Sequence, residues 1–527
     1  MTSTAVYLAI LVLISLLTRS LPRFICPGAC GKDAYYHLLA AERIRRNGMR
    51  MPATLKEFVL PGIYDYPPLL HYLWALFPFR WHLTVERWSS AVIDAVHAMV
   101  VYVFSYYFFN SAPSIQDPSF VAFNSALIFI MSPALLTIGT GPRAYQGTPR
   151  TLGELLFSLT LCFSVIGYFN GMIIPFFLAV LFGALLCLTS KFAVQAMVFF
   201  YVVFALVTLQ AYWIILLVGI FMAALVISKG HYAKVAVGHI AHSRYYLHAI
   251  SKRFYLLTHR NSWNELKKTT RTIFRNPFRA AKDLFFYHSW THLLVNHPLL
   301  LVIIYILLTN SPAAGHDIAF FLLLWIAAGL VAFILTSLKP FLFLGEAERY
   351  LEYALLPQVL YLGISNNLNS TPYIILSYFV GLYLFFSVGF IYGYRNKEKM
   401  LPKFSELVRF ICGDDTIHRV LPLYLNDAVQ LAYESEKAIA HFPANFRKKF
   451  MPFEKFFDFY QKIYPFPNED LKGLMIEYDL DTLYYSSSDL ERAVSFGLNY
   501  NFDAFKIIFS NEEYAVLQIK PEIENGL

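Results

Sequence analysis

Residues 192–228 read FAVQAMVFFYVVFALVTLQAYWIILLVGIFMAALVIS, a run of 37 residues without a charged side chain. A helix needs about 20 mostly apolar residues to cross a bilayer, so this stretch is too long for one crossing and barely long enough for two. We expect two membrane spans with a turn near residues 210–213. The choice between one span and two sets the orientation of everything that follows.

The composition of the whole chain points the same way. Hydrophobic residues make up 57% of the 527 residues, charged residues make up 15%, and the mean hydropathy is +0.49. An average soluble domain is about 45–50% apolar and about 25% charged, so an ordinary soluble chain and a disordered chain are both excluded. Further candidate spans lie at 4–19, 89–109, 119–138, 151–168, 172–189, 296–309, 317–337, 353–365 and 372–394. We therefore predict an α-helical polytopic membrane protein with about eleven transmembrane helices, beginning with an uncleaved helix.

The polar segments between these spans are unevenly distributed. Long, charged loops fall on one side of the membrane, at 20–88, 139–150, 229–295 and 338–352, together with the tail from 395. Short links with almost no charge fall on the other side. A membrane protein with its long loops on one face is expected to carry out its chemistry on that face.

The charge of the loops bears on which face this is. Residues 229–283 contain twelve Lys or Arg against Glu265 and Asp283, so the positive-inside rule favours the cytoplasm. That rule weakens for a loop of this length. The net charge of +8 suits lipid headgroups, since the basic residues lie in loops beside apolar segments, and we expect no nucleic-acid partner.

From residue 395 the composition becomes that of a soluble protein. Residues 505–519, FKIIFSNEEYAVLQI, predict two strands around a turn at 510–511. We divide the chain into a transmembrane domain at 1–399, with a first loop at 20–88 and an amphipathic loop at 229–295, and a small α/β domain at 400–527.

The first long loop carries the most informative residues. Asp33 follows the first span and precedes an amphipathic stretch at 34–47, and residues 64–68, YDYPP, form a stiff turn before an apolar stretch. Because a carboxylate at a membrane boundary is costly to desolvate, it is expected to have a charged partner or a functional role. The plainer alternatives are an ordinary interfacial acid and a bare turn.

This loop resembles the first extracytoplasmic loop of the GT-C glycosyltransferases, which use polyprenyl-phosphate sugars. In the lipid A aminoarabinose transferase and protein O-mannosyltransferase group, an acid follows the first helix and a later motif with Pro-Pro leads to the second. Asp33 and residues 65–69, DYPPL, match these two motifs, and residues 33–38, DAYYHL, resemble the D-x-x-Y-H-L of oligosaccharyltransferases. Residues 188–191, LTSK, and Arg349-Tyr350 with Pro357 match two later motifs in the same order.

The sequence also departs from the family pattern. Ala34 replaces the second acid of the usual pair, and Tyr66 replaces the lysine before Pro-Pro. The tryptophans form no W-W-D-Y-G signature, which argues against oligosaccharyltransferase activity itself. These departures leave the acceptor open.

The resemblance implies a role for each matching residue. Asp33 would be the base that deprotonates the acceptor. The donor phosphate would be bound by Arg349 and Tyr350, with Lys191, Tyr66, Arg143 and Arg150 as further candidates. The alternatives are that Glu346 or Glu348 neutralises Arg349, that Lys191 extends to the headgroups, and that Arg143 and Arg150 anchor the chain, with Glu154 as a partner.

A divalent metal is the one cofactor that the sequence suggests. Eight of the fifteen histidines lie between 231 and 297, some with the spacing of metal ligands, although interfacial aromatic residues give the same pattern. We consider an ion shared by Asp65 and His288, because both loops lie on the active face. Separately, the basic, aromatic-laced stretch at 252–282 is expected to lie on the bilayer surface.

We predict a membrane glycosyltransferase that transfers a sugar from a polyprenyl-phosphate donor to a lipid, glycan or protein acceptor. It would lie in the bacterial inner membrane, with its active face extracytoplasmic. A transporter or flippase of lipid-linked sugars is the main alternative, but the spans carry little mid-membrane charge. A non-catalytic scaffold is a third.

Overall fold

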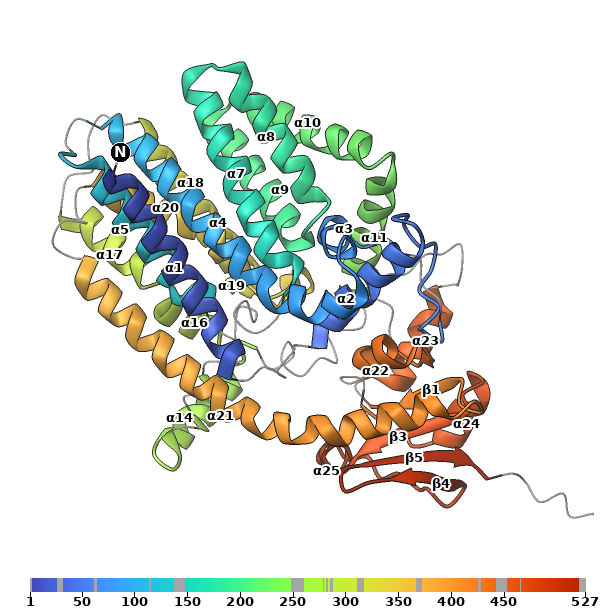
Figure 1. Cartoon of the computed structure of the whole chain (residues 1–527). Helices are drawn as coiled ribbons and strands as arrows, with labels where there is room; N and C mark the ends of the chain where they lie inside the picture. Colours follow the sequence, from blue (N-terminus) through green and yellow to red (C-terminus); the bar gives the residue numbers. More distant parts are fainter. Residues whose placement is uncertain are drawn as a thin grey trace, which may run out of the picture.

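A computed structural model describes residues 2–25, 32–60, 64–112, 115–136, 147–247, 260–277, 279–280, 283–284, 288–309, 317–365, 372–424, 428–441, 453–464 and 466–520. Helices dominate this part of the chain, and a small sheet lies near its C-terminal end (Figure 1). The predicted fold class, an apolar helical domain followed by a small sheet, is confirmed.

A helix lies within each apolar segment of the described chain. These helices are α1 (Thr2–Ile25), α4 (His82–Asn110), α5 (Pro118–Met131), α7 (Pro149–Asn170), α8 (Ile173–Cys187), α9 (Lys191–Thr208), α10 (Tyr212–Ile227), α17 (Pro298–Thr309), α18 (Asp317–Ser337), α20 (Leu355–Ile364) and α21 (Pro372–Gly413). Among the described residues, five helices are long and apolar enough to cross a membrane, or up to seven if two sharply bent helix pairs each count as one span. Eleven crossings therefore stay a prediction.

The long uncharged stretch forms two helices, as predicted. Helix α9 ends at Thr208, Leu209 takes the left-handed conformation with φ 53°, and α10 begins at Tyr212. The Tyr212 hydroxyl donates to the backbone oxygen of Ser164 on α7 at 2.9 Å, which fixes the turn against a neighbouring helix.

Two buried ion pairs hold α1 against its neighbours. Arg19 Nε lies 2.7 Å from Asp94 Oδ2 on α4, and Arg19 Nη2 donates to the backbone oxygen of Ile130 on α5 at 2.9 Å. Arg23 lies 2.6 Å from Glu86, also on α4. All four side chains are buried, and charges in an apolar bundle are expected only where they are paired in this way.

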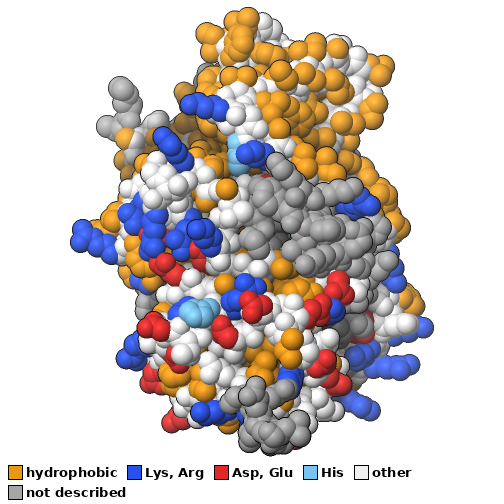
Figure 2. Space-filling model, turned by 90° about the vertical axis from the view of Figure 1, so that its right-hand side faces the viewer, with side chains coloured by type: hydrophobic (Ala, Val, Ile, Leu, Met, Phe, Trp, Pro, Cys, Tyr) orange, Lys and Arg blue, Asp and Glu red, His pale blue; other side chains and the backbone are white. Residues whose placement is uncertain are grey.

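The polar elements gather on one side of the bundle. Figure 1 shows α2 (Lys32–Arg46), α14 (Trp263–Ile273) and the sheet on the side away from the N-terminus. Figure 2 shows apolar side chains dominating the upper surface of the molecule and charged side chains gathering over the lower part. Shorter elements connect the helices: α3 (Leu69–Ala75), η1 (Phe79–Trp81), α6 (Pro133–Leu136), α11 (His231–Tyr245), α16 (Ser289–Asn296), η4 (Lys339–Leu344) and α19 (Glu348–Glu352).

The sheet has five strands in the order β2-β1-β3-β5-β4. Strand β1 runs parallel to β2 and β3, whereas β5 runs antiparallel to β3 and β4. The two strands predicted around residues 510–511 are present as β4 and β5. The elements are β1 (Arg419–Pro422), β2 (Ala438–Ile439), β3 (Thr482–Ser486), β4 (Phe505–Ser510), β5 (Tyr514–Ile519), α22 (Ala428–Ser435), α23 (Phe453–Ile463), α24 (Leu471–Glu477) and α25 (Ser487–Ser495).

The first loop is joined to this sheet. Phe58 bridges to Ile439 at the edge of β2: Val59 N–H donates to the Ile439 oxygen at 3.0 Å, and Ile439 N–H donates to the Glu57 oxygen at 2.9 Å. Arg46 on α2 lies 2.8 Å from Glu436. The helix that begins near Asp33 is therefore held by C-terminal residues, while α21 runs through residue 400 to Gly413.

Candidate active site

Helix α2 fixes the position of Asp33. It is an amphipathic helix that buries Tyr35, Leu38 and Ile44, with α3 and α22 as its main neighbours, and Asp33 lies in its first turn. A carboxylate is stabilised there by the unpaired N–H groups at the helix N-terminus. The Asp33 side chain thus has a fixed place and still keeps contact with solvent.

Asp33 interacts electrostatically with Arg349, Glu346 and Tyr66. Although the carboxyl is accessible, the atoms packed around it desolvate it and raise its pKa; Arg349 opposes this shift and Glu346 adds to it. Burial likewise raises the pKa of Tyr66, with a contribution from the Asp33 charge. Asp33 and Tyr66 come from the first loop and Arg349 from residues more than 280 positions later, so the fold brings these three predicted site residues together.

Arg349 is held by its own segment. It forms an ion pair with Glu346, and its guanidinium carbon lies 4.5 Å from the centre of the Phe192 ring. Gly345, with φ 108°, makes this approach possible, because a Cβ there would lie 2.5 Å from Phe192. The structure thus shows the ion pair with Glu346 that the sequence offered as an alternative, and Arg349 also interacts electrostatically with Asp33.

The acids around Arg349 form a row of ion pairs. Glu348 pairs with Arg260, and the His292 Nε2 atom lies 3.5 Å from Glu348. Glu352 pairs with Arg150. Burial works against the ionised form of Glu346, but Arg349 and Arg260 together hold its pKa below the ordinary value. These ion pairs hold the short α19 segment against α16 and α7, and α19 also packs on α18 and α9.

A second group of charged side chains, more deeply buried, surrounds Asp65. The Asp65 side chain is fully buried and interacts electrostatically with Lys191, the first residue of α9, and with Tyr36. Helix α11 packs directly on this carboxylate, since a Cβ on Gly238 would lie 2.3 Å from Asp65 Oδ2. His239 on the same helix interacts with Lys191. Two motifs that are far apart in sequence, DYPP and LTSK, thus meet here.

A buried chain of hydrogen bonds lies beside both groups. His37 Nδ1 and His71 Nε2 are 2.8 Å apart, and the Tyr64 hydroxyl is bonded to His71 Nδ1. Burial lowers the pKa of His37 to about 3 and that of His71 well below its ordinary value, so both rings are neutral. The ring of Tyr66 lies 5.3 Å from His37 and 5.5 Å from His71. The chain therefore ties α2 and α3 together behind Tyr66.

The other predicted site residues have different surroundings. The Tyr350 hydroxyl is committed to the Leu344 oxygen at 2.8 Å and to Gln195 at 3.0 Å, so its visible role is to position the segment. Arg150 lies between Glu352 and Glu154, the latter at 3.5 Å, which matches the expected Glu154 partner. Arg143 lies outside the described residues.

The described residues provide no set of ligands for the predicted divalent metal ion. Among the residues that the structure describes, no group of three or more His, Cys, Asp or Glu side chains could hold a metal ion. His288 lies near Glu265 at the start of α16, whereas Asp65 faces Lys191 and Tyr36. An ion shared by Asp65 and His288 stays a prediction from sequence.

Sequence reasoning missed several residues of this site. Arg260 lay in a stretch interpreted only as a lipid-facing segment, yet it is 5% exposed and paired with Glu348. His71 is separated from His37 by 34 positions, so the local sequence pattern does not predict their contact. The sequence offers one signal for His71, which is its position three residues after the YDYPP motif.

Comparison with known proteins rests on structure alone. No protein-family model and no curated protein matches the chain. The apo form of the Archaeoglobus fulgidus oligosaccharyltransferase aligns with a TM-score of 0.51 at 10% identity, covering 92% of this chain and 69% of that chain. The fold is that of the GT-C glycosyltransferases.

Two further GT-C structures were found at lower similarity. The archaeal oligosaccharyltransferase AglB from the same organism, in complex with an inhibitory peptide and a dolichol-phosphate, has a TM-score of 0.47 at 11% identity and covers 92% of this chain and 69% of that chain. ArnT from Cupriavidus metallidurans has a TM-score of 0.43 at 12% identity and covers 97% and 98% of the two chains. At these identities the GT-C likeness concerns the fold and leaves donor and acceptor open.

Proposed function

We propose that this protein is an integral-membrane glycosyltransferase that transfers a sugar from a polyprenyl-phosphate donor to an acceptor at the extracytoplasmic face. The observation that carries this proposal is the meeting of Asp33, Tyr66 and Arg349 on one side of a GT-C fold. An acid that can take a proton and a cation that can hold a phosphate are the two groups that this reaction requires.

The reaction assigns a task to each group. Asp33 accepts the proton of the acceptor hydroxyl or amine as that atom bonds to the anomeric carbon of the sugar. The bond from the anomeric carbon to the phosphate oxygen breaks, and polyprenyl phosphate leaves with the electron pair. Arg349 stabilises the charge on the leaving phosphate, since a guanidinium has five N–H donors and the ion pair with Glu346 does not exhaust them.

The raised pKa of Asp33 supports its role as the base. A carboxylate whose pKa is above the ordinary 3.8 is a better proton acceptor than an aspartate with the ordinary pKa. Arg349 opposes this shift, because its positive charge favours the ionised carboxylate. The same cation would therefore hold the donor phosphate and favour the form of Asp33 that accepts a proton.

Lys191 is the second cation of the proposed site. It begins α9 on the face where Asp65 lies, and its interaction with this buried acid accounts for a positive charge at the end of an apolar helix. Because Tyr66 stands where the family has a lysine, Lys191 and Arg349 would share the phosphate between them. The family resemblance is what supports the proposed extracytoplasmic side and bacterial inner membrane.

A flippase is less well supported. Transporters break their helices near the middle of the membrane, around the substrate. The described bent pairs are α10 with α11, at 118°, and α16 with α17, at 71°. The α11 segment packs on Asp65, and His292 of α16 faces Glu348, so both breaks lie beside the polar face rather than at mid-span.

Binding of polyprenyl phosphate tests the proposal without knowledge of the sugar. This molecule is the product common to all such donors, and native mass spectrometry of the purified protein can follow its retention. We expect retention of polyprenyl phosphate, and a loss of about 10-fold or more in Arg349→Ala, because a charge-assisted hydrogen bond contributes about 1.5–3 kcal/mol. Equal retention of the uncharged polyprenol would contradict the proposal.

A further inference from the structure

Helix α14 exposes apolar and basic side chains side by side. Trp263 is 68% exposed and Phe274 is 93% exposed, and the two lie eleven residues apart, which places them on one face of an α-helix. Lys267 and Arg271 lie four residues apart on the adjacent face, and Arg275 follows just beyond the C-terminal end of the helix. Large exposed apolar residues beside a row of cations are typical of a helix lying in a membrane interface.

The start of α14 is fixed at the membrane boundary. Asn261 donates to the backbone oxygen of Ser337, the last residue of the apolar helix α18, at 3.2 Å. The Asn261 side chain also accepts from Ser289 N–H at 2.9 Å, and Arg260 donates to the Ser289 hydroxyl at 3.0 Å. Because Ser337 ends a candidate span, α14 begins at the depth of the lipid headgroups on the polar side.

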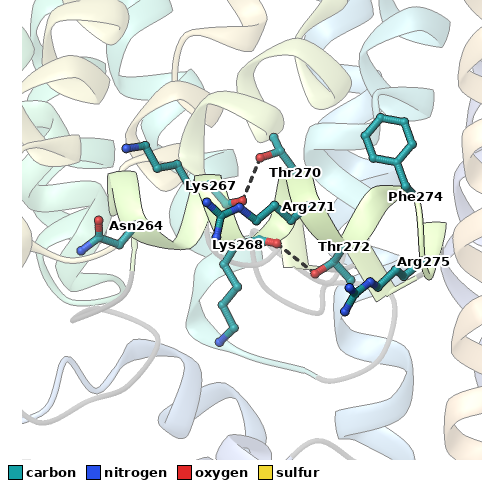
Figure 3. A pocket seen from close by; sticks show the side chains of 8 residues that line it. All are labelled: Asn264, Lys267, Lys268, Thr270, Arg271, Thr272, Phe274 and Arg275. Carbon is teal, nitrogen blue, oxygen red and sulfur yellow. Dashed lines mark hydrogen bonds between the residues drawn. The ribbon is translucent and has the colours of Figure 1, made fainter.

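An open hollow of about 880 Å³ lies along this helix (Figure 3). Its lining consists of cations, hydroxyl groups, one amide and one aromatic ring: Asn264, Lys267, Lys268, Thr270, Arg271, Thr272, Phe274 and Arg275. Figure 3 shows Lys268 and Phe274 pointing to opposite sides of the helix. Glu265, at 3.9 Å from Lys268, is the acid within α14, so the helix keeps a strong positive excess.

We infer that α14 is a docking site for anionic phospholipid headgroups of the leaflet on the polar side of the protein. The apolar face would enter the acyl boundary through Trp263 and Phe274, while the cations hold headgroup phosphates. A soluble acidic partner would match the charge but would leave both large apolar side chains in water. This inference does not depend on the proposed transferase activity.

Trp263 provides the probe. The protein is reconstituted in mixed vesicles of phosphatidylglycerol and phosphatidylcholine, with bromine on the acyl chains of one lipid at a time, and the Trp263 signal is the difference from Trp263→Phe. We expect stronger quenching by the brominated phosphatidylglycerol, corresponding to an enrichment of about fivefold for each cation close to the surface. The preference should weaken in high salt.

A charge-matched pair of variants identifies the cause. Lys267→Gln/Arg271→Gln should bring quenching by the two brominated lipids to the same level, whereas Arg409→Gln/Lys506→Gln, which removes two exposed cations of the C-terminal region, should leave the preference unchanged. Equal quenching by both lipids in the unmodified protein would overturn the inference. Absence of any Trp263 quenching would overturn it as well, and would point to a soluble partner.

Discussion

Substitution of Arg349 tests whether this cation binds the donor phosphate or only stabilises the fold. It is paired with Glu346 and interacts electrostatically with Asp33, so both roles have a structural basis. We predict that Arg349→Lys weakens use of the donor by about 10- to 100-fold with the protein still folded, because lysine cannot reproduce the planar fork that binds two phosphate oxygens. Donor titration of the transfer rate measures this. If Arg349 serves only Glu346, the lysine variant will keep most of its activity and Arg349→Ala will instead lower the melting temperature.

The raised pKa of Asp33 leads to a prediction about stability as well as catalysis. Its pKa is higher in the folded protein than the ordinary 3.8, so folding favours the protonated form. Stability therefore falls as the pH rises from the ordinary value through the folded value, and the loss is complete above the folded value. Asp33→Asn cannot ionise, and we predict an equal or higher melting temperature than that of the natural protein near about pH 7, with the difference disappearing near about pH 4. Thermal unfolding at both pH values measures this. A clear loss of stability near neutral pH would make Asp33 a structural acid.

At the scale of elements, the bonded chain of Tyr64, His71 and His37 holds α2 and α3 together. His71→Phe leaves the other two polar groups buried without their partner, which costs about 1–3 kcal/mol for each group. We predict that Tyr64→Phe and His71→Phe together destabilise by less than their sum, with a coupling of about 0.5 kcal/mol or more. Denaturant unfolding measures the cycle. Tyr64→Phe combined with the distant Tyr500→Phe is the additive control, and additivity in the first pair would refute the coupling.

Elements were predictable where a local pattern sets them. The break between α9 and α10 followed from the length of an uncharged run, and β4 with β5 from alternation around a turn. The edge pairing of residues 57–59 with β2 and the 118° bend before α11 were not predictable. Both depend on contacts between segments distant in sequence, on which single-sequence periodicity carries no information.

The same division holds for the candidate site at the scale of the whole molecule. Asp33, Tyr66, Lys191 and Arg349 were selected from short motifs, and the fold gathers them. Arg260 and His71 were missed because their partners, Glu348 and His37, are remote in the chain. Tyr350 and Arg150 lie in or beside such motifs, but their side chains bind other residues of the protein, Leu344 and Glu352. A sequence motif predicts the position of a residue but not the partner of its side chain.

The orientation of the whole molecule gives a separate prediction. The polar face, the sheet and the C-terminal region lie on the side away from the N-terminus, and we place them outside the cytoplasm (Figure 1). A C-terminal fusion to an enzyme that is active only in an oxidising extracytoplasmic compartment should therefore be active. A fusion active only in the cytoplasm would reverse both the topology and the proposed active face.

The central claim is that Asp33 acts as the base in sugar transfer from a lipid phosphate. Release of polyprenyl phosphate from labelled polyprenyl-phosphate sugars tests it most directly, with Asp33→Asn compared against Asp317→Asn, an exposed acid that begins α18 at the opposite end of the bundle. We predict that Asp33→Asn lowers release by at least about 100-fold and that Asp317→Asn leaves it unchanged. Undiminished release by the folded Asp33→Asn protein would contradict the account.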